Sequence, residues 1–191
     1  MHEDEHGLEG RGGDARSAQQ LDARAVVCAV PDPELPYVTL GDLGVVAAVH
    51  EDGYTRSVRV ELTPTYLGCP ATEVIQRDVE NALLDAGWRS VAVVLRFDPP
   101  WTPERISATG RAKLAAEGVA PPPRMRPAGH TPVPVFVELG GVRAEVPCPR
   151  CGAAQTERLS AFGPAPCQEL RRCTACLEPF PAIKSSPVRL R

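Results

Sequence analysis

The sequence predicts an α+β protein, in which a small three-stranded sheet packed with helices is followed by a C-terminal zinc-ribbon-like module. Three short segments, 45–49, 57–63 and 91–97, are rich in valine and are predicted to be strands; in the second and third, apolar residues recur at every second position, as in half-buried strands. Apolar residues at helical spacing surround these segments. Two Cys-x-x-C pairs follow a proline-rich stretch near the end of the chain.

Composition changes divide the 191 residues into four parts. Residues 1–16 are polar and glycine-rich, which predicts a disordered tail. Residues 17–120 carry the strand and helix patterns and are expected to form the α+β domain. Residues 121–134 contain six prolines and predict a stiff linker. The ribbon module is expected over 135–191.

Three helices are expected around the sheet. Residues 17–30 place Leu21, Ala25 and Cys28 on one face, so Cys28 is interpreted as a small buried apolar residue. Residues 71–86 show a second apolar face and end at a glycine. Residues 107–117 form the last predicted helix.

Charge and cysteine content exclude several classes of function. The net charge of −3 offers no overall attraction to a nucleic acid or an acidic membrane. A basic excess after Leu139 is interpreted as charge that offsets a metal–thiolate centre, with Arg150, Arg171 and Arg172 as the nearby cations. The chain shows no signal peptide and no apolar run long enough to span a bilayer, so a cytoplasmic protein is expected. Seven cysteines in such a chain indicate metal binding rather than disulfides.

The two Cys-x-x-C pairs predict a structural Zn²⁺ site. Twenty-one residues separate the pairs, and each pair lets a tight turn direct two thiolates at one ion. An iron–sulfur cluster on the same cysteines is the main alternative. Cys167 either replaces one of these ligands or packs in the interior, and packing is favoured. The four predicted ligands are Cys148, Cys151, Cys173 and Cys176.

Cys69 is the candidate reactive thiol of the first domain. It precedes Pro70, which suits the first position of a helix, so Cys69 is expected at the helix N-cap. Unpaired backbone N–H groups there favour the thiolate form. Asp32 and Glu34, in a rigid proline-rich loop, are candidate oxygen ligands or solvated carboxylates. No histidine is placed to act as a base, which argues against a cysteine hydrolase.

Several motifs in residues 20–120 resemble the SufT-like metal–sulfur cluster assembly domain. These motifs are Asp32-Pro-Glu-Leu-Pro36, Leu40-Gly-Asp-Leu-Gly-Val45, Leu62-Thr-Pro-Thr-Tyr-Leu-Gly-Cys-Pro70 and Pro100-Trp-Thr-Pro-Glu-Arg-Ile-Ser107. The two Cys-x-x-C pairs with Glu178-Pro-Phe180 are similar to the tail of the D subunits (also called J) of bacterial phenylacetyl-CoA epoxidase. The family tail continues to a further cysteine, where this chain has Ile183-Lys-Ser185.

The resemblance implies a non-catalytic accessory subunit in bacterial phenylacetate catabolism. Such a subunit assists assembly of an iron–sulfur or di-iron centre, with Cys69 as the residue that transiently binds iron or a cluster and Asp32 and Glu34 near it. The implied partners are other epoxidase subunits or the iron–sulfur reductase component. Two alternatives remain: an adaptor whose linker and ribbon bind a partner, and an enzyme with Cys69 as nucleophile.

Overall fold

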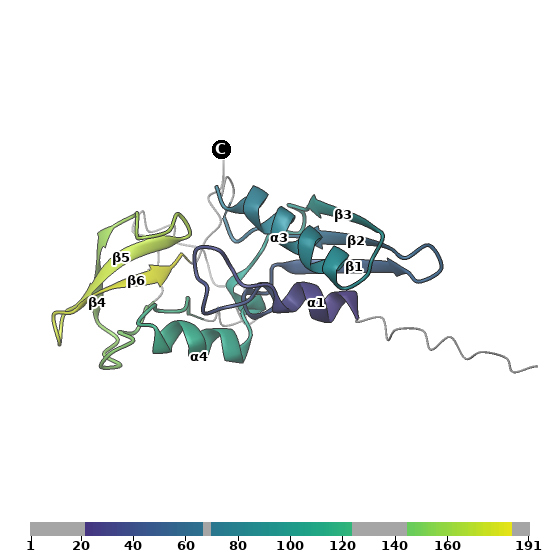
Figure 1. Cartoon of the computed structure of the whole chain (residues 1–191). Helices are drawn as coiled ribbons and strands as arrows, with labels where there is room; N and C mark the ends of the chain where they lie inside the picture. Colours follow the sequence, from purple (N-terminus) through teal and green to yellow (C-terminus); the bar gives the residue numbers. More distant parts are fainter. Residues whose placement is uncertain (1–21, 67–69, 124–144, 185–191) are drawn as a thin grey trace, which may run out of the picture.

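The computed structural model describes residues 22–66, 70–123 and 145–184. It contains two small sheets at opposite ends of the molecule, with helices packed on the first (Figure 1). The helices are α1 (Ala23–Ala29), α2 (Leu40–Leu43), α3 (Thr72–Asp85), the short 3-10 helix η1 (Pro103–Arg105) and α4 (Ala108–Ala116). The strands are β1 (Val46–Asp52), β2 (Ser57–Leu62), β3 (Ser90–Leu95), β4 (Thr156–Ser160), β5 (Gln168–Cys173) and β6 (Pro179–Ile183). The predicted α+β fold with a C-terminal ribbon is confirmed.

The first sheet has the order β1-β2-β3. Strands β1 and β2 form an antiparallel hairpin, and β3 returns parallel to β2 after the crossover through α3. In β2, Val58, Val60 and Leu62 are buried while the residues between them reach solvent. The alternation predicted for this strand is therefore confirmed, because a period of two places every second side chain on the core face.

Helix α2 is a single helical turn that begins with a capping box. The Thr39 hydroxyl accepts a bond from the Asp42 backbone N–H at 3.1 Å, and the Asp42 carboxylate accepts one from the Thr39 N–H at 3.2 Å. This capping box satisfies two donors that a helix start otherwise leaves unpaired. Gly44 ends the helix at φ +65°, and a Cβ there would lie 2.2 Å from the Arg105 carbonyl oxygen. Only glycine fits both requirements.

The second sheet has the order β4-β5-β6, with both pairings antiparallel. Its small core consists of Ala120, Val146, Cys148, Cys173, Phe180 and Ala182. Leu159 and Phe162 are 48% and 72% exposed. Phe180 and Ala182 from β6 fill the interior of the ribbon instead.

The ribbon is docked against the first domain. Ala120 forms a parallel bridge with Ala182, through its N–H to the Pro181 carbonyl at 2.9 Å and its carbonyl to the Ile183 N–H at 3.0 Å. The Ile183 side chain is buried in the core of the first domain, and Cys167 packs against that core. The two modules therefore share an interface built from the last strand of the ribbon.

Trp101 is part of the core of the first domain. Its side chain is 2% exposed, and its indole N–H donates to the Leu43 carbonyl at 2.9 Å. Among the described helices, none has the length and apolar character needed to cross a membrane.

Candidate metal sites

Four cysteine sulfurs converge at one end of the ribbon sheet. The Sγ atoms of Cys148, Cys151, Cys173 and Cys176 all lie within 4.8 Å of one another. Cys148 and Cys173 are buried, whereas Cys151 and Cys176 lie at the surface. The distances are 3.8 Å between Cys148 and Cys176 and 3.6 Å between Cys151 and Cys173. These sulfurs are arranged as a set able to bind one metal ion, as the spacing predicted.

Each Cys-x-x-C pair lies on a tight turn that ends in a left-handed residue. Gly152 follows the first pair at φ +75°, and Leu177 follows the second at φ +63°. The Cys173 sulfur accepts backbone N–H groups of Ala175 and Cys176 at 3.4 and 3.5 Å. The bond from Cys176 leads the effects that lower the pKa of Cys173 to about 6. These bonds favour the thiolate at Cys173, which is the form that binds a metal, whereas the pKa of Cys176 in the same turn is raised.

The three arginines named in the sequence analysis each have a carboxylate neighbour. Arg150 lies 3.4 Å from Glu178, Arg171 lies 2.6 Å from Glu169, and Arg172 pairs with Glu157. Their contribution to offsetting the charge of the thiolates stays a prediction.

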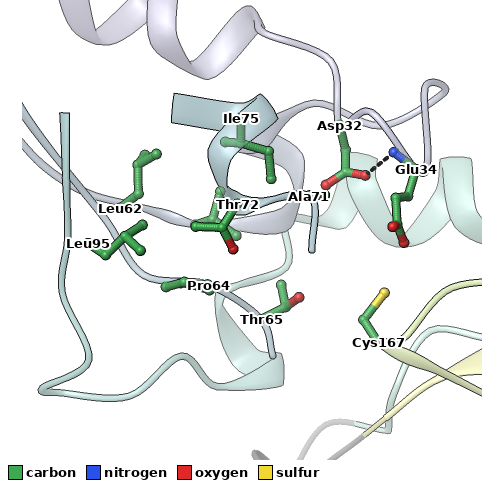
Figure 2. Close-up of a pocket in the computed structure, with 11 residues that line it drawn as sticks. Asp32, Glu34, Leu62, Pro64, Thr65, Ala71, Thr72, Ile75, Leu95 and Cys167 are labelled. Atoms are coloured by element: carbon green, nitrogen blue, oxygen red, sulfur yellow. Dashed lines mark hydrogen bonds between the residues drawn. The ribbon is translucent and has the colours of Figure 1, made fainter. Parts of the chain in front are cut away.

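A second candidate site is a pocket in the first domain (Figure 2). Asp32 and Glu34 line it from the proline-rich loop. Apolar side chains form much of its wall. The remaining lining residues are Val45, Leu62, Pro64, Thr65, Ala71, Thr72, Ile75, Leu95 and Cys167.

The two carboxylates in this pocket are held differently. Asp32 Oδ1 accepts the backbone N–H groups of Glu34 and Leu35, both at 2.9 Å, which fixes the side chain (Figure 2). Burial raises the pKa of Asp32, although these two bonds partly oppose the shift. Burial, followed by the charge of Asp32, raises the pKa of the exposed Glu34. Both shifts mean that the pocket disfavours uncompensated negative charge, which a bound cation would relieve.

Cys69 lies outside the described residues, within the segment 67–69. The described chain on both sides of that segment lines the pocket, through Pro64 and Thr65 before it and Ala71 and Thr72 after it. Asp32 and Glu34 therefore share a pocket with the neighbours of Cys69 in the chain. The expected helix start is different: α3 begins at Thr72, and its N-cap is Ala71, which has no side-chain cap bond. Pro70 is thus not the first helical residue, and the N-cap argument for a Cys69 thiolate does not hold.

The structure adds two residues to this neighbourhood. Cys167 packs against the first core, as favoured from the sequence, and stays outside the four clustered sulfurs; its place in the lining of the pocket was not predicted. Tyr37 follows the proline-rich loop, and burial, then the charges of Glu117, Cys167 and Asp32, raises its pKa. The two Cys-x-x-C pairs leave Cys167 outside their pattern, which is the one sequence signal for its separate place.

The carboxylate of Asp32 is expected to be unfavourable for folding and needed for metal binding. In Asp32→Asn, the amide oxygen still accepts from Glu34 and Leu35, while the desolvated charge is removed. We expect a thermal midpoint at pH 7 no lower than wild type, and iron affinity at least about tenfold weaker. The raised pKa makes wild type lose stability relative to the variant as pH rises through that pKa. Thermal denaturation across pH and iron titration measure both effects, and a variant clearly less stable at pH 7 would make Asp32 a structural residue.

Two family models match the chain in separate regions. The iron–sulfur cluster assembly protein family matches residues 22–95, which include β1 to β3 and α3. The PaaD zinc beta ribbon domain matches residues 132–184, which include the four clustered cysteines. The first match includes three of the four motifs that suggested the first resemblance and ends before Pro100–Ser107; the second includes both Cys-x-x-C pairs.

Comparison with known proteins finds one relative that matches most of the chain and others that match about half of it. The putative D subunit of 1,2-phenylacetyl-CoA epoxidase from Escherichia coli (strain K12) is 37% identical over 84% of this chain and 89% of its own length. The Fe-S protein maturation auxiliary factor YitW of Bacillus subtilis (strain 168) is 34% identical over 46% of this chain and 85% of its own length. A solved domain of unknown function, DUF59, from Bacillus anthracis is 32% identical, with a TM-score of 0.44, over 48% of this chain and 87% of that one.

Proposed function

The chain belongs to the family of the D subunit of 1,2-phenylacetyl-CoA epoxidase, and from this membership we propose that it is an accessory subunit of that epoxidase system. In this role it assists assembly of an iron–sulfur or di-iron centre and does not itself act on the substrate. The observation that carries the proposal is the pocket that Asp32 and Glu34 line together with residues before and after Cys69 in the chain.

The chemistry of this pocket suits a transient iron site. Carboxylate oxygens are hard ligands and thiolate sulfur is a soft one, and iron accepts both. Asp32 is fixed by its two backbone bonds, whereas Glu34 is exposed. A site with one half-buried, fixed carboxylate and one at the solvent is suited to binding and release, because part of the ligand set stays in place. In this proposal Cys69 supplies the thiolate, and iron or a cluster is the cargo.

The ribbon site is proposed to hold Zn²⁺ in a structural role. Four thiolates at a Zn–S distance of about 2.3 Å in tetrahedral geometry place their sulfurs about 3.8 Å apart. The measured pairs, at 3.8 and 3.6 Å, agree with that edge length. Four protein ligands leave no open position for a reacting molecule, so zinc would stabilise the module and supply no catalytic chemistry.

The proposed partners are other subunits of the epoxidase or its iron–sulfur reductase component. A cytoplasmic location accompanies this proposal, because both proposed sites need reduced cysteines. An adaptor role is the alternative. The observation that favours it is the exposure of Leu159, Phe162 and Leu177 on the ribbon, which offer apolar surface to a partner. The two roles differ in what they require of Cys69.

The proposal is tested by epoxidase activity in cells that lack their own copy of this accessory subunit. Cys69→Ala is expected to reduce epoxidase activity at least about tenfold while the protein accumulates at normal levels, because it removes the proposed thiolate ligand. Cys28→Ala is the matched control, since Cys28 is a partly buried thiol that does not line the pocket. Full activity with Cys69→Ala would contradict the assembly role and leave the adaptor in its place.

A further inference from the structure

Cys167 reaches the metal pocket of the first domain from the ribbon module. It lies in the connection between β4 and β5, directly before Gln168. Its side chain lines the same pocket as Asp32 and Glu34, and Figure 2 shows its sulfur pointing toward the Glu34 side chain. These three groups come from two modules and are brought together by the docking of the ribbon.

The position of Cys167 is fixed by neighbouring contacts. The Lys184 backbone N–H donates to the Cys167 carbonyl at 3.0 Å, and the Lys184 ammonium donates to the Pro166 carbonyl at 2.7 Å. The same ammonium lies 5.1 Å from the centroid of the Tyr66 ring and 5.2 Å from that of Phe162. Lys184 therefore connects the loop that carries Cys167 to Tyr66, the last described residue before the segment with Cys69.

The charge around the pocket calls for a cation. Among the described residues that line it, none is basic, while Asp32 and Glu34 carry carboxylates and Cys167 carries a thiol. The ammonium of Lys184 is directed at a carbonyl and two rings. A thiolate and two carboxylates in a mainly apolar pocket are stabilised most simply by a bound metal ion.

The ribbon does not need Cys167 for its own metal. Cys148, Cys151, Cys173 and Cys176 already provide four sulfurs within 4.8 Å of one another. In the described parts of the chain, these sulfurs are the one group of three or more metal-ligating side chains gathered so closely. The ligand atoms of Asp32, Glu34 and Cys167 are not gathered so closely. Binding one ion through all three therefore requires side-chain rotation, for example of the exposed Glu34.

We propose that Cys167 is a metal ligand that the ribbon contributes to the pocket of Asp32 and Glu34. The site is then incomplete without the ribbon, and the combined sulfur and oxygen ligands favour a divalent transition metal such as Fe²⁺ over Mg²⁺ or Ca²⁺. This inference rests on the metal handling proposed for the pocket. It gives the ribbon a direct part in that handling, because its docking positions one of the ligands.

The test asks whether Fe²⁺ protects individual cysteines from alkylation. The full zinc-loaded chain is treated anaerobically with iodoacetamide, with and without Fe²⁺, and the labelling rate at each cysteine is followed by mass spectrometry. Fe²⁺ is expected to slow labelling of Cys167 at least about tenfold, because a metal-bound thiolate is a poor nucleophile. Cys28, which does not line the pocket, is the internal control and should be unaffected.

The outcomes separate this inference from the proposed function. Protection of both Cys167 and Cys69 supports both. Protection of Cys69 alone overturns the role of Cys167 and leaves the proposed function in place. Protection of Cys167 alone supports the inference and removes Cys69 from the proposed site. Protection of neither contradicts both. Titration of Cys167→Ser beside Cys28→Ser provides a second measure, with Fe²⁺ affinity expected to fall at least about tenfold only in the former.

Discussion

Replacing Cys173 with serine is expected to release the metal ion of the ribbon and to unfold that module. Cys173 is fully buried, and its sulfur accepts two backbone N–H bonds. The core to which it belongs consists of six buried residues, of which Phe180 is the one large side chain and two are cysteines of the sulfur cluster. Structural zinc contributes about 10–16 kcal/mol to the folding of small zinc modules, so losing one of four thiolates removes most of the stabilisation. Metal content and amide hydrogen exchange of β4 to β6 measure the effect.

A matched control for this prediction is Cys167→Ser. Cys167 lies in the same module but outside the cluster of four sulfurs, so this variant should keep both its zinc and the exchange protection of the ribbon strands. Retention of stoichiometric zinc and protected strands in Cys173→Ser would contradict the proposed structural role of the metal. Chelation of the wild-type protein should reproduce the Cys173→Ser result, because it removes the same ion.

Replacing Asp42 with alanine is expected to destabilise the first domain by about 2–4 kcal/mol. The carboxylate caps α2 through the Thr39 N–H, accepts from the Ser107 hydroxyl at 3.3 Å and from the Lys113 ammonium at 2.6 Å. These bonds join α2 to the start and the middle of α4. Because Asp42 is buried, its removal leaves polar groups without partners. The midpoint of urea unfolding, followed by helix circular dichroism, measures the loss.

Acid should reproduce part of this effect in the wild type. Burial acts to raise the pKa of Asp42, but the bonds from Lys113 and Thr39 outweigh it and lower the pKa below the usual aspartate value. The stability from this carboxylate is therefore complete above the usual aspartate pKa and is lost as pH falls through the lowered value.

Lys113→Met serves as the control for Asp42→Ala and should cost less than about 1 kcal/mol, because Lys113 is 41% exposed and the cap remains. An equal loss in both variants would contradict the capping account.

Local sequence patterns predicted the regular elements well. The alternation of Val58, Val60 and Leu62 predicted β2, since one face of a strand must be apolar to pack on helices. The two Cys-x-x-C pairs predicted a four-sulfur cluster, because tight turns place such sulfurs together whatever surrounds them. The start of α3 was harder to predict, because a proline at position 70 suits both the first residue of a helix and the turn that precedes a helix.

The pocket depended on contacts that local patterns do not contain. Asp32 and Cys167 are separated by most of the chain, and they meet because the bridge between Ala120 and Ala182 docks the ribbon on the first domain. Neither alanine carries a sequence signal for such a bridge, since backbone groups alone form it.

The most direct test of the central proposal is the metal content of anaerobically purified protein, wild type beside Cys69→Ser. Zinc, iron and acid-labile sulfide are measured in both after incubation with an iron and sulfide source. We expect about one zinc per chain in both proteins, from the ribbon, and iron in the wild type that falls at least about tenfold in Cys69→Ser. Equal iron in the two proteins, or none in the wild type, would contradict iron handling at Cys69.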